Sequence, residues 1–292
     1  MKRIPLTILS CLITTTVYAE AVDKTIDASP DGQVEISNIA GSIVVEGWSR
    51  DVVQVTGTLG KDVEELILER DGDDIVIKVK VPKGNSRSIG SDLRISVPQE
   101  SSIDIGAVSA DIDVSNVRGD QELQTVSGNV EAEFSGGALS AESVSGAIVI
   151  EGNNSDGEVS ASTVSGNVAV FRVSGELNAE AVNGDVVVDE GSFDRANLEA
   201  ISGDLRFEAE LRKGGKLQLE TVNGDIDVDF VGDVSAEIDI DTFNGNIRNC
   251  FGPKPFRASK YVPSLELSFE EGGAAGSVAI SAVNGNVSLC KK

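Results

Sequence analysis

Short stretches in which apolar and charged residues alternate strictly recur along most of the chain. In the stretches Val130–Phe134 and Ile226–Phe230, apolar side chains occupy every second position and carboxylates lie between them. Because successive side chains of a β-strand point to opposite faces, this period of two predicts half-buried strands.

A six-residue phrase precedes these strands at nearly constant spacing. It reads small residue, apolar residue, Ser or Asn, Gly, short residue, aliphatic residue, as in Thr125–Val130. Its glycines are Gly128, Gly146, Gly166, Gly184, Gly203, Gly224, Gly245 and Gly285. The steps between them are 18, 20, 18, 19, 21, 21 and 40 residues, and the last step indicates two periods with one phrase lost near residue 265. A looser turn lies in the middle of each period, so each unit reads strand, loose turn, strand, tight turn.

Two architectures fit this unit. Asn-Gly and Ser-Gly between aliphatic residues are typical of hairpins, which would join the strands in an antiparallel meander. Alternatively, each period is one coil of a parallel β-solenoid. About eighteen strands exceed the roughly ten at which open sheets curl or split, which favours the solenoid. We therefore predict an all-β, single-domain β-solenoid with two strands per coil, each coil being 18 to 21 residues long.

The solenoid gives each position of the phrase a role. Glycine at the corner provides either a positive φ angle or room for close approach of adjacent coils. We expect the residue before each glycine, such as Ser127 or Asn223, to stack in a polar ladder that satisfies the turn amides.

The chain divides into four predicted parts. Residues 1–19 resemble an export signal, since Lys2 and Arg3 precede an apolar run that is too short to span a membrane. Residues 20–30 form an N-terminal extension, and residues 31–105 form the first coils and a cap that covers the open end. Residues 106–292 form the repeat solenoid. The sequence therefore predicts an exported protein, periplasmic or secreted, with no transmembrane span.

Without the signal, 22 basic and 48 acidic residues give a formal charge of −26 (22 − 48). This charge argues against partners such as nucleic acid and anionic lipid surfaces. The only basic cluster is Lys254, Arg257 and Lys260, which lies among three prolines and is a possible partner-binding loop.

Cys250 and Cys290 are the cysteines that follow the predicted signal. In an exported protein they are expected to form a disulfide, which would pin the basic loop to the last coil. Closing a loop of 41 residues corresponds to roughly 4 kcal/mol in the chain-entropy estimate. Two buried free thiols are the alternative.

No catalytic, cofactor-binding or metal-binding residues are predicted. The chain has no histidine, which excludes Ser-His-Asp and Cys-His nucleophile systems and the usual zinc sites. Rows of alternating acids such as Asp225, Asp227 and Asp229 suggest a weak calcium site, although a solvated face that discourages association of sheets is favoured. Because carboxylate pairs also serve glycoside hydrolysis, an enzyme acting on polysaccharides is a second alternative.

The phrases resemble those of the bacterial "putative adhesin" family. The resemblance rests on Gly47–Gly57, on the repeated Val-Ser/Asn-Gly-Asp/Asn-Val, and on the ending Asn284–Cys290, and it covers residues 31–291. It implies an extracytoplasmic β-solenoid domain of unknown function, with no catalytic residues. We therefore predict a non-catalytic adhesin or cell-envelope binding module whose partner is unknown, with the polysaccharide enzyme and a calcium-responsive module as alternatives.

Overall fold

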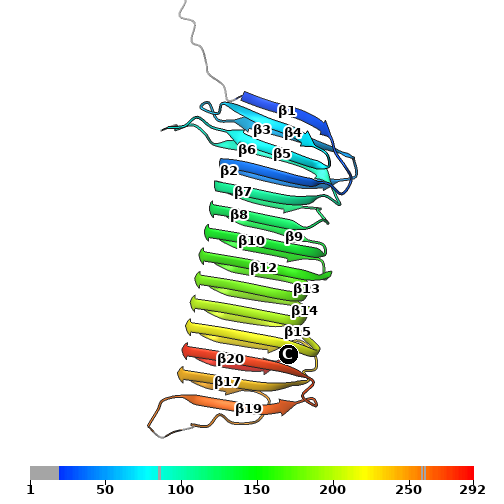
Figure 1. Cartoon of the computed structure of the whole chain (residues 1–292). Coiled ribbons are helices and arrows are strands. Elements are labelled where there is room, and N and C mark those ends of the chain that lie inside the picture. Colours follow the sequence, from blue (N-terminus) through cyan, green and yellow to red (C-terminus); the bar gives the residue numbers. More distant parts are fainter. Residues whose placement is uncertain (1–19, 85–86, 258, 260) are drawn as a thin grey trace, which may run out of the picture.

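The chain forms an elongated stack of β-coils. The computed structural model describes residues 20–84, 87–257, 259 and 261–292. In these residues 21 strands join in one hydrogen-bonded sheet, and none is helical. The sheet winds around itself from β1 at one end to β19 at the other (Figure 1). The fold is therefore all-β and β-solenoid-like. The predicted signal at residues 1–19 lies outside the described residues.

The strands follow one another along the chain without helical connections in the described residues. The first eight are β1 Glu20–Asp27, β2 Gln33–Trp48, β3 Val52–Leu59, β4 Glu65–Asp71, β5 Asp74–Lys80, β6 Ser91–Pro98, β7 Ser102–Ser115 and β8 Gln121–Ser127. The next seven are β9 Val130–Phe134, β10 Gly137–Ser145, β11 Ile148–Gly152, β12 Asp156–Ser165, β13 Val168–Asn183, β14 Val186–Ser202 and β15 Leu205–Asn223. The last six are β16 Ile226–Phe230, β17 Ala236–Asn244, β18 Ile247–Asn249, β19 Leu265–Glu271, β20 Gly276–Asn284 and β21 Val287–Lys291.

Successive coils stack through parallel pairing. β10 lies between β8 and β12, all three parallel, and Leu139 pairs with both Gln121 and Val159. β11 lies in the same way between β9 and the first half of β13. Long strands such as β14 bend around the stack and take part in both ladders. Parallel pairing through this region excludes the antiparallel meander.

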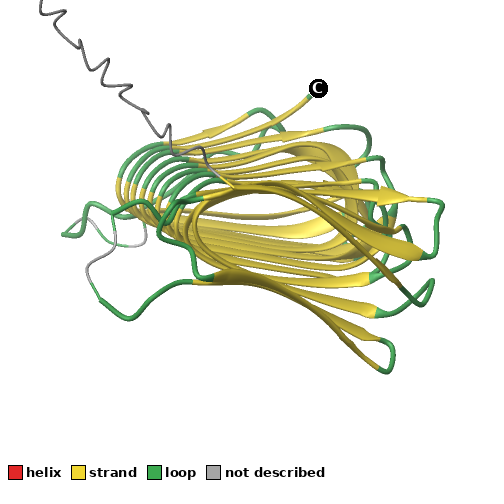
Figure 2. Ribbon diagram, turned by 90° about the horizontal axis from the view of Figure 1, so that it is seen from above, coloured by secondary structure: helices red, strands yellow, loops and turns green. Residues whose placement is uncertain are grey.

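The inward side chains of both ladders fill the interior of a flattened tube, which Figure 2 shows along its axis. The core consists mainly of Val, Ile, Leu and Ala, and it includes a column of aromatic rings. Phe193 and Phe207 have ring centroids 5.7 Å apart, and Phe207 and Phe230 are 6.2 Å apart. Each such buried side chain contributes about 1.5–3 kcal/mol of hydrophobic free energy.

Close approach of coils explains the corner glycines. A Cβ added to Gly146, Gly203 or Gly224 would lie well within 3.0 Å of the carbonyl oxygen of the glycine in the adjacent coil. Among the eight repeat glycines, only Gly184 has a positive φ angle. The glycines therefore serve mainly to let main chains of neighbouring coils approach closely.

The side chains that bond the turn amides lie two positions later in the phrase than the sequence predicts. In most coils the residue that follows the glycine bonds a turn amide of the adjacent coil: Asn129 Oδ1 accepts a hydrogen bond from the Ala147 amide (3.0 Å), and Asp185 Oδ1 accepts one from the Asp204 amide (2.9 Å). Of the residues before the glycines, Asn284 donates through Nδ2 to Asn223 Oδ1 (3.0 Å). With Asn244, which donates to Asn284 (3.0 Å), these residues form the short polar ladder that was predicted. The prediction that this position satisfies the turn amides was wrong, because the side chain after the glycine bonds them.

The coils at the C-terminal end do not stack in sequence order. β20 pairs with β15 on one side and β17 on the other, and β21 lies between β16 and β18. The final coil is thus inserted between two coils that precede it in the chain (Figure 1). The long step of 40 residues from Gly245 to Gly285 reflects this reversal, in which the chain passes through β19 before it returns.

The N-terminal end has a matching reversal. β2 lies between β7 on one side and β5 and β6 on the other, all parallel to it. Antiparallel strands then close both ends of the stack: β3 pairs with β6 and β1, and β19 pairs with β17. Antiparallel end strands cover the open edges of the parallel coils.

A substitution of one corner glycine tests the close approach. Gly203→Ala is expected to destabilise the protein by about 1–3 kcal/mol, because the added methyl group overpacks the corner. Gly106→Ala is the matched control, since nothing lies within 4 Å of a Cβ at that position, and it is expected to change stability by less than about 1 kcal/mol. Urea unfolding of both variants measures the difference. Equal stability of the two would contradict this account of the corner.

Candidate functional site

A column of exposed apolar side chains runs along the stack beside the glycine corners. Its members stand two positions before each corner glycine, or before Ala110 in the first case, and are 36% to 51% exposed. In the order of the coils, this apolar wall consists of Val108, Val126, Val144, Val164, Val182, Ile201, Val222, Val283 and Phe243. Most of the large hydrophobic side chains that the described residues expose belong to this column.

A second column, two residues earlier on the same strands, is polar and largely acidic. It contains the carboxylates Glu142, Glu180, Glu199 and Glu220, which we call the acidic wall, with Gly106, Gln124, Ser162 and Ser281 at the other coils of the groove. Asp241 continues the column beyond the groove and accepts a hydrogen bond from Ser281 (3.0 Å). Neighbouring amide side chains orient three of these carboxylates. Asn178 donates to Glu180 (2.8 Å), Asn197 to Glu199 (2.9 Å) and Gln218 to Glu220 (2.8 Å).

Small buried residues form the floor between the two walls. They are Ala107, Thr125, Ser143, Thr163, Ala181, Ala200 and Thr221. Where the floor residue has a hydroxyl group, that group donates to the corner carbonyl of the adjacent coil, as Thr163 Oγ1 does to Gly146 O (3.1 Å). These hydroxyl groups are therefore occupied in holding the corners together.

The two walls and the floor enclose a groove of about 930 Å³. It runs from Ile39 to Val283, which belong to the first and last of nine successive coils. At the spacing of about 4.8 Å between parallel strands, eight steps give a length of about 38 Å. The groove is therefore long and narrow, and one of its sides is apolar. On the other side the carboxylates occupy the coils from Glu142 to Glu220, and Lys78 of β5 lines the end next to β2.

The carboxylates of the acidic wall have no cationic partner within the described residues. The ion pairs there involve other acids, such as Asp156 and Asp194, which both pair with Arg212 at the opposite corner. Hydrogen bonds from Arg212 to these two carboxylates raise the pKa of its guanidinium group. The acidic wall is thus a source of uncompensated negative charge.

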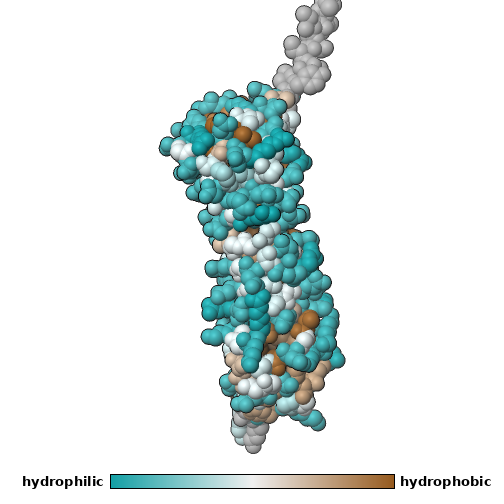
Figure 3. Space-filling model, turned by 90° about the vertical axis from the view of Figure 1, so that its right-hand side faces the viewer, coloured by the Kyte–Doolittle hydropathy of each residue, from teal (hydrophilic) through white to brown (hydrophobic). Residues whose placement is uncertain are grey.

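The opposite side of the stack has a different character. Figure 3 shows the side away from the glycine corners as mainly hydrophilic, with apolar atoms gathered near the ends. This side carries the loose turns and the Arg212 ion pairs. The nine exposed side chains of the apolar wall lie instead on the groove side.

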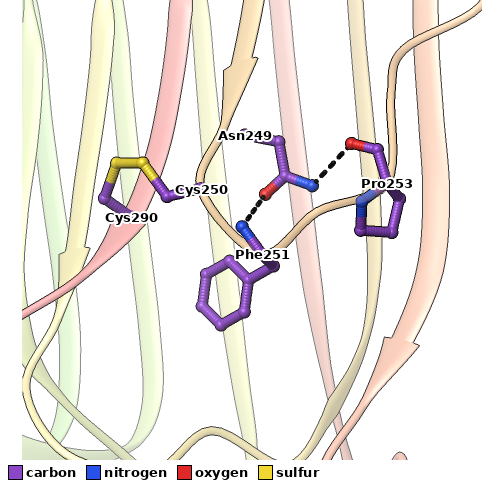
Figure 4. The surroundings of a disulfide bond; sticks show 5 residues. All are labelled: Asn249, Cys250, Phe251, Pro253 and Cys290. Carbon is purple, nitrogen blue, oxygen red and sulfur yellow. Dashed lines mark hydrogen bonds between the residues drawn. A yellow bond between two sulfur atoms is a disulfide. The ribbon is translucent and has the colours of Figure 1, made fainter.

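The structure joins Cys250 and Cys290 in a disulfide, with their Cα atoms 4.9 Å apart. Cys290 lies in the inserted strand β21, and Cys250 follows β18 of the adjacent coil. Next to it, Asn249 accepts a hydrogen bond from the Phe251 amide and donates one to the Pro253 carbonyl, both at 3.1 Å (Figure 4). The disulfide therefore links the coil of β17 and β18 to the coil of β20 and β21, whose order in the stack is the reverse of their order in the chain.

Lys292 adds a second tie at the same end. Its ammonium group donates to Glu208 in β15, and this bond, together with one from Arg206, holds the pKa of the Glu208 carboxyl below its usual value. The C-terminus is thereby anchored to a coil beyond β16.

The predicted basic loop is not brought together with the groove. Lys254 and Arg257 are exposed on the segment that follows the disulfide, and Lys260 lies outside the described residues. A smaller hollow of about 390 Å³ lies nearby, between β17 and β19, and is lined by residues that include Phe243 and Phe256.

The calcium alternative has no preformed site in the described residues. No group of three or more Asp, Glu or Cys side chains there is arranged to hold a metal ion. Asp225, of the acidic rows, instead accepts hydrogen bonds from the amide and side chain of Asn286 in the adjacent coil. No helix among these residues is long and apolar enough to cross a membrane.

Sequence reasoning missed the groove, although the signal was present. Since Leu123 and Thr125 point inward, Val126 must point outward by strict alternation. An aliphatic residue at an outward position, repeated in nearly every phrase, was the available sign of an exposed apolar column.

Comparisons with known proteins agree with the fold. The family profile described as Toastrack DUF4097 matches residues 29–181 and 173–290. No curated protein matches the chain significantly. A crystal structure described as a putative lipid binding protein from Parabacteroides distasonis is 15% identical, with a TM-score of 0.54 over 92% of this chain and 96% of that one. Another, described as a putative adhesin from the same organism, is 11% identical, with a TM-score of 0.44 over 93% and 98%.

Removing the disulfide tests its role at the end of the stack. The Cys250→Ser/Cys290→Ser variant is expected to lose about 2–4 kcal/mol of stability. The variant is also expected to exchange its amide hydrogens faster than the wild type. Because each coil contacts only its neighbours, this increase should be confined to strands β17 to β21. Exchange that increases evenly along the whole stack would contradict this role. In the unfolded, unreduced wild type, these two cysteines are expected to give no reactive thiol.

Proposed function

Because the chain belongs to the Toastrack family (DUF4097), whose description assigns no activity, we propose that it is an exported, non-catalytic binding module of the cell envelope. The family membership confirms the resemblance to bacterial adhesin-like proteins that the corner phrases suggested. The observation that carries the proposal is the apolar wall, which keeps nine aliphatic or aromatic side chains between a third and a half exposed along one side of the stack.

The exposed column is long and continuous. Monomeric soluble proteins rarely expose long contiguous apolar surfaces, and those that do usually bind a partner there. Ligand sites are typically concave, with apolar lining and a few polar groups that orient the ligand. The groove has both features, and the hydroxyl groups of its floor bond to corner carbonyls, as in Thr125 to Ala110 (3.2 Å). Its chemistry therefore supports binding rather than catalysis.

The proposal includes the layout expected from the sequence. Residues 1–19 direct export to the periplasm or beyond the cell, and residues 31–292 form a single-domain solenoid with two strands per coil. The net charge of −26 (22 − 48) keeps this rod soluble and away from anionic surfaces. The basic residues Lys254 and Arg257 form an accessory contact at one end of the rod.

Polar replacement of the apolar wall tests the proposal. Val144→Thr/Val164→Thr/Val182→Thr keeps the β-branched shape and removes the apolar surface. Purified protein is added to cells from which its gene has been deleted, and the fraction that sediments with the cells is measured. The triple variant is expected to bind the envelope at least tenfold more weakly than the wild type, with an unchanged melting temperature.

The matched control is Val231→Thr/Val262→Thr, which alters two residues of comparable exposure, 44% and 37%, outside the groove. The control is expected to bind as the wild type does. Envelope binding that the wall triple leaves unchanged would show that the groove is not the binding surface.

A further inference from the structure

The separation of the two walls limits what the groove can hold. The walls stand on outward positions two residues apart on the same strands, so they are about 7 Å from one another. An α-helix with its side chains is about 10–12 Å wide and does not fit between them. A single extended polypeptide backbone, which occupies about 4.8 Å of sheet width, does fit.

The chemistry of the walls then specifies the side chains of such a segment. An extended chain laid along the groove directs successive side chains to opposite sides. One set would contact the apolar wall, from Val108 to Val283, and the other would contact the acidic wall, from Glu142 to Glu220. A segment that alternates aliphatic residues with Lys or Arg satisfies both walls along the five coils from Glu142 to Glu220.

We propose that the groove binds an extended segment of a partner protein, about 12 residues long, in which aliphatic and basic residues alternate. The length follows from a groove of about 38 Å and a rise of about 3.3 Å per residue. This inference rests on the proposed function, because it names the partner of the same groove. The groove recognises the side chains of the partner rather than its backbone.

Charge distinguishes this partner from the other possible occupants. Glu180, Glu199 and Glu220 lie on three successive coils, each oriented by an amide group, and none is ion-paired within the described residues. An acyl chain would contact the apolar wall and leave these carboxylates without a cationic partner. A second copy of the chain would place two acidic walls close together and is disfavoured by repulsion.

The probe is a labelled 12-residue peptide that alternates Val and Lys, with both ends blocked. Its binding to the mature, disulfide-bonded protein is measured by fluorescence anisotropy at about 0.15 M salt, where the Debye length of about 8 Å weakens non-specific attraction. The peptide is expected to bind at least tenfold more tightly than an alternating Ser/Lys peptide of equal charge. An alternating Val/Glu peptide is expected not to bind.

Neutralising the wall locates the contact. Glu180→Gln/Glu199→Gln/Glu220→Gln is expected to weaken binding of the Val/Lys peptide at least tenfold. The matched control, Asp113→Asn/Glu131→Gln/Asp227→Asn, removes the same charge from exposed positions on the other ladder and is expected to bind as the wild type does. The Val144→Thr/Val164→Thr/Val182→Thr variant should weaken binding to the level of the Ser/Lys peptide.

Three results would overturn the inference. Equal binding of the Val/Lys and Ser/Lys peptides, or equal loss in both neutralised triples, would show general attraction to an acidic protein. Binding of an uncharged dodecyl probe in the groove, with no binding of the Val/Lys peptide, would identify an acyl chain as the occupant and leave the proposed function intact. Failure of the proposed function is seen separately, as envelope binding that the wall triple does not change.

Discussion

The close contact between corner glycines of adjacent coils is the constraint on which the rest of the structure depends. Gly203 approaches the carbonyl of Gly184, and Gly224 approaches that of Gly203, so closely that neither has room for a Cβ. This contact holds each pre-corner strand directly beside the next one. The side chains at equivalent positions therefore form straight columns, and a feature present once in the phrase becomes a continuous surface along the protein.

The columns explain how one repeated phrase provides both stability and a binding surface. The position three residues before the glycine points inward and is small, and its hydroxyl group, where present, bonds to the neighbouring corner. The position two residues before the glycine points outward and is apolar. Stacking of β-branched side chains on one another stabilises the strands in part, but Val126 and Val144 stay nearly half exposed. Their remaining surface is available to a partner.

Strands, corners and the acidic surface were predictable from the sequence because each follows from local alternation or from the glycine phrase. The order of the coils at both ends was not. The phrase around Gly245 is nearly the same as that around Gly285, so the sequence does not say which of them stacks on Gly224. The antiparallel strand β19, the disulfide and the C-terminal ties determine that order, and these are long-range contacts. The groove was overlooked for another reason, since its walls come from alternate residues of many strands and only stacking unites them.

The most direct test of this account measures a distance along the apolar wall. Spin labels at Val126→Cys and Val283→Cys, with the native cysteines held in their disulfide, report how many coils separate these positions. The observed order places six steps between them, which at about 4.8 Å each corresponds to about 29 Å. A stack in sequence order with one lost phrase would place eight steps there, or about 38 Å. A narrow distribution at the six-step distance is the predicted result, and one at the eight-step distance would contradict both the inserted coil and the continuity of the wall.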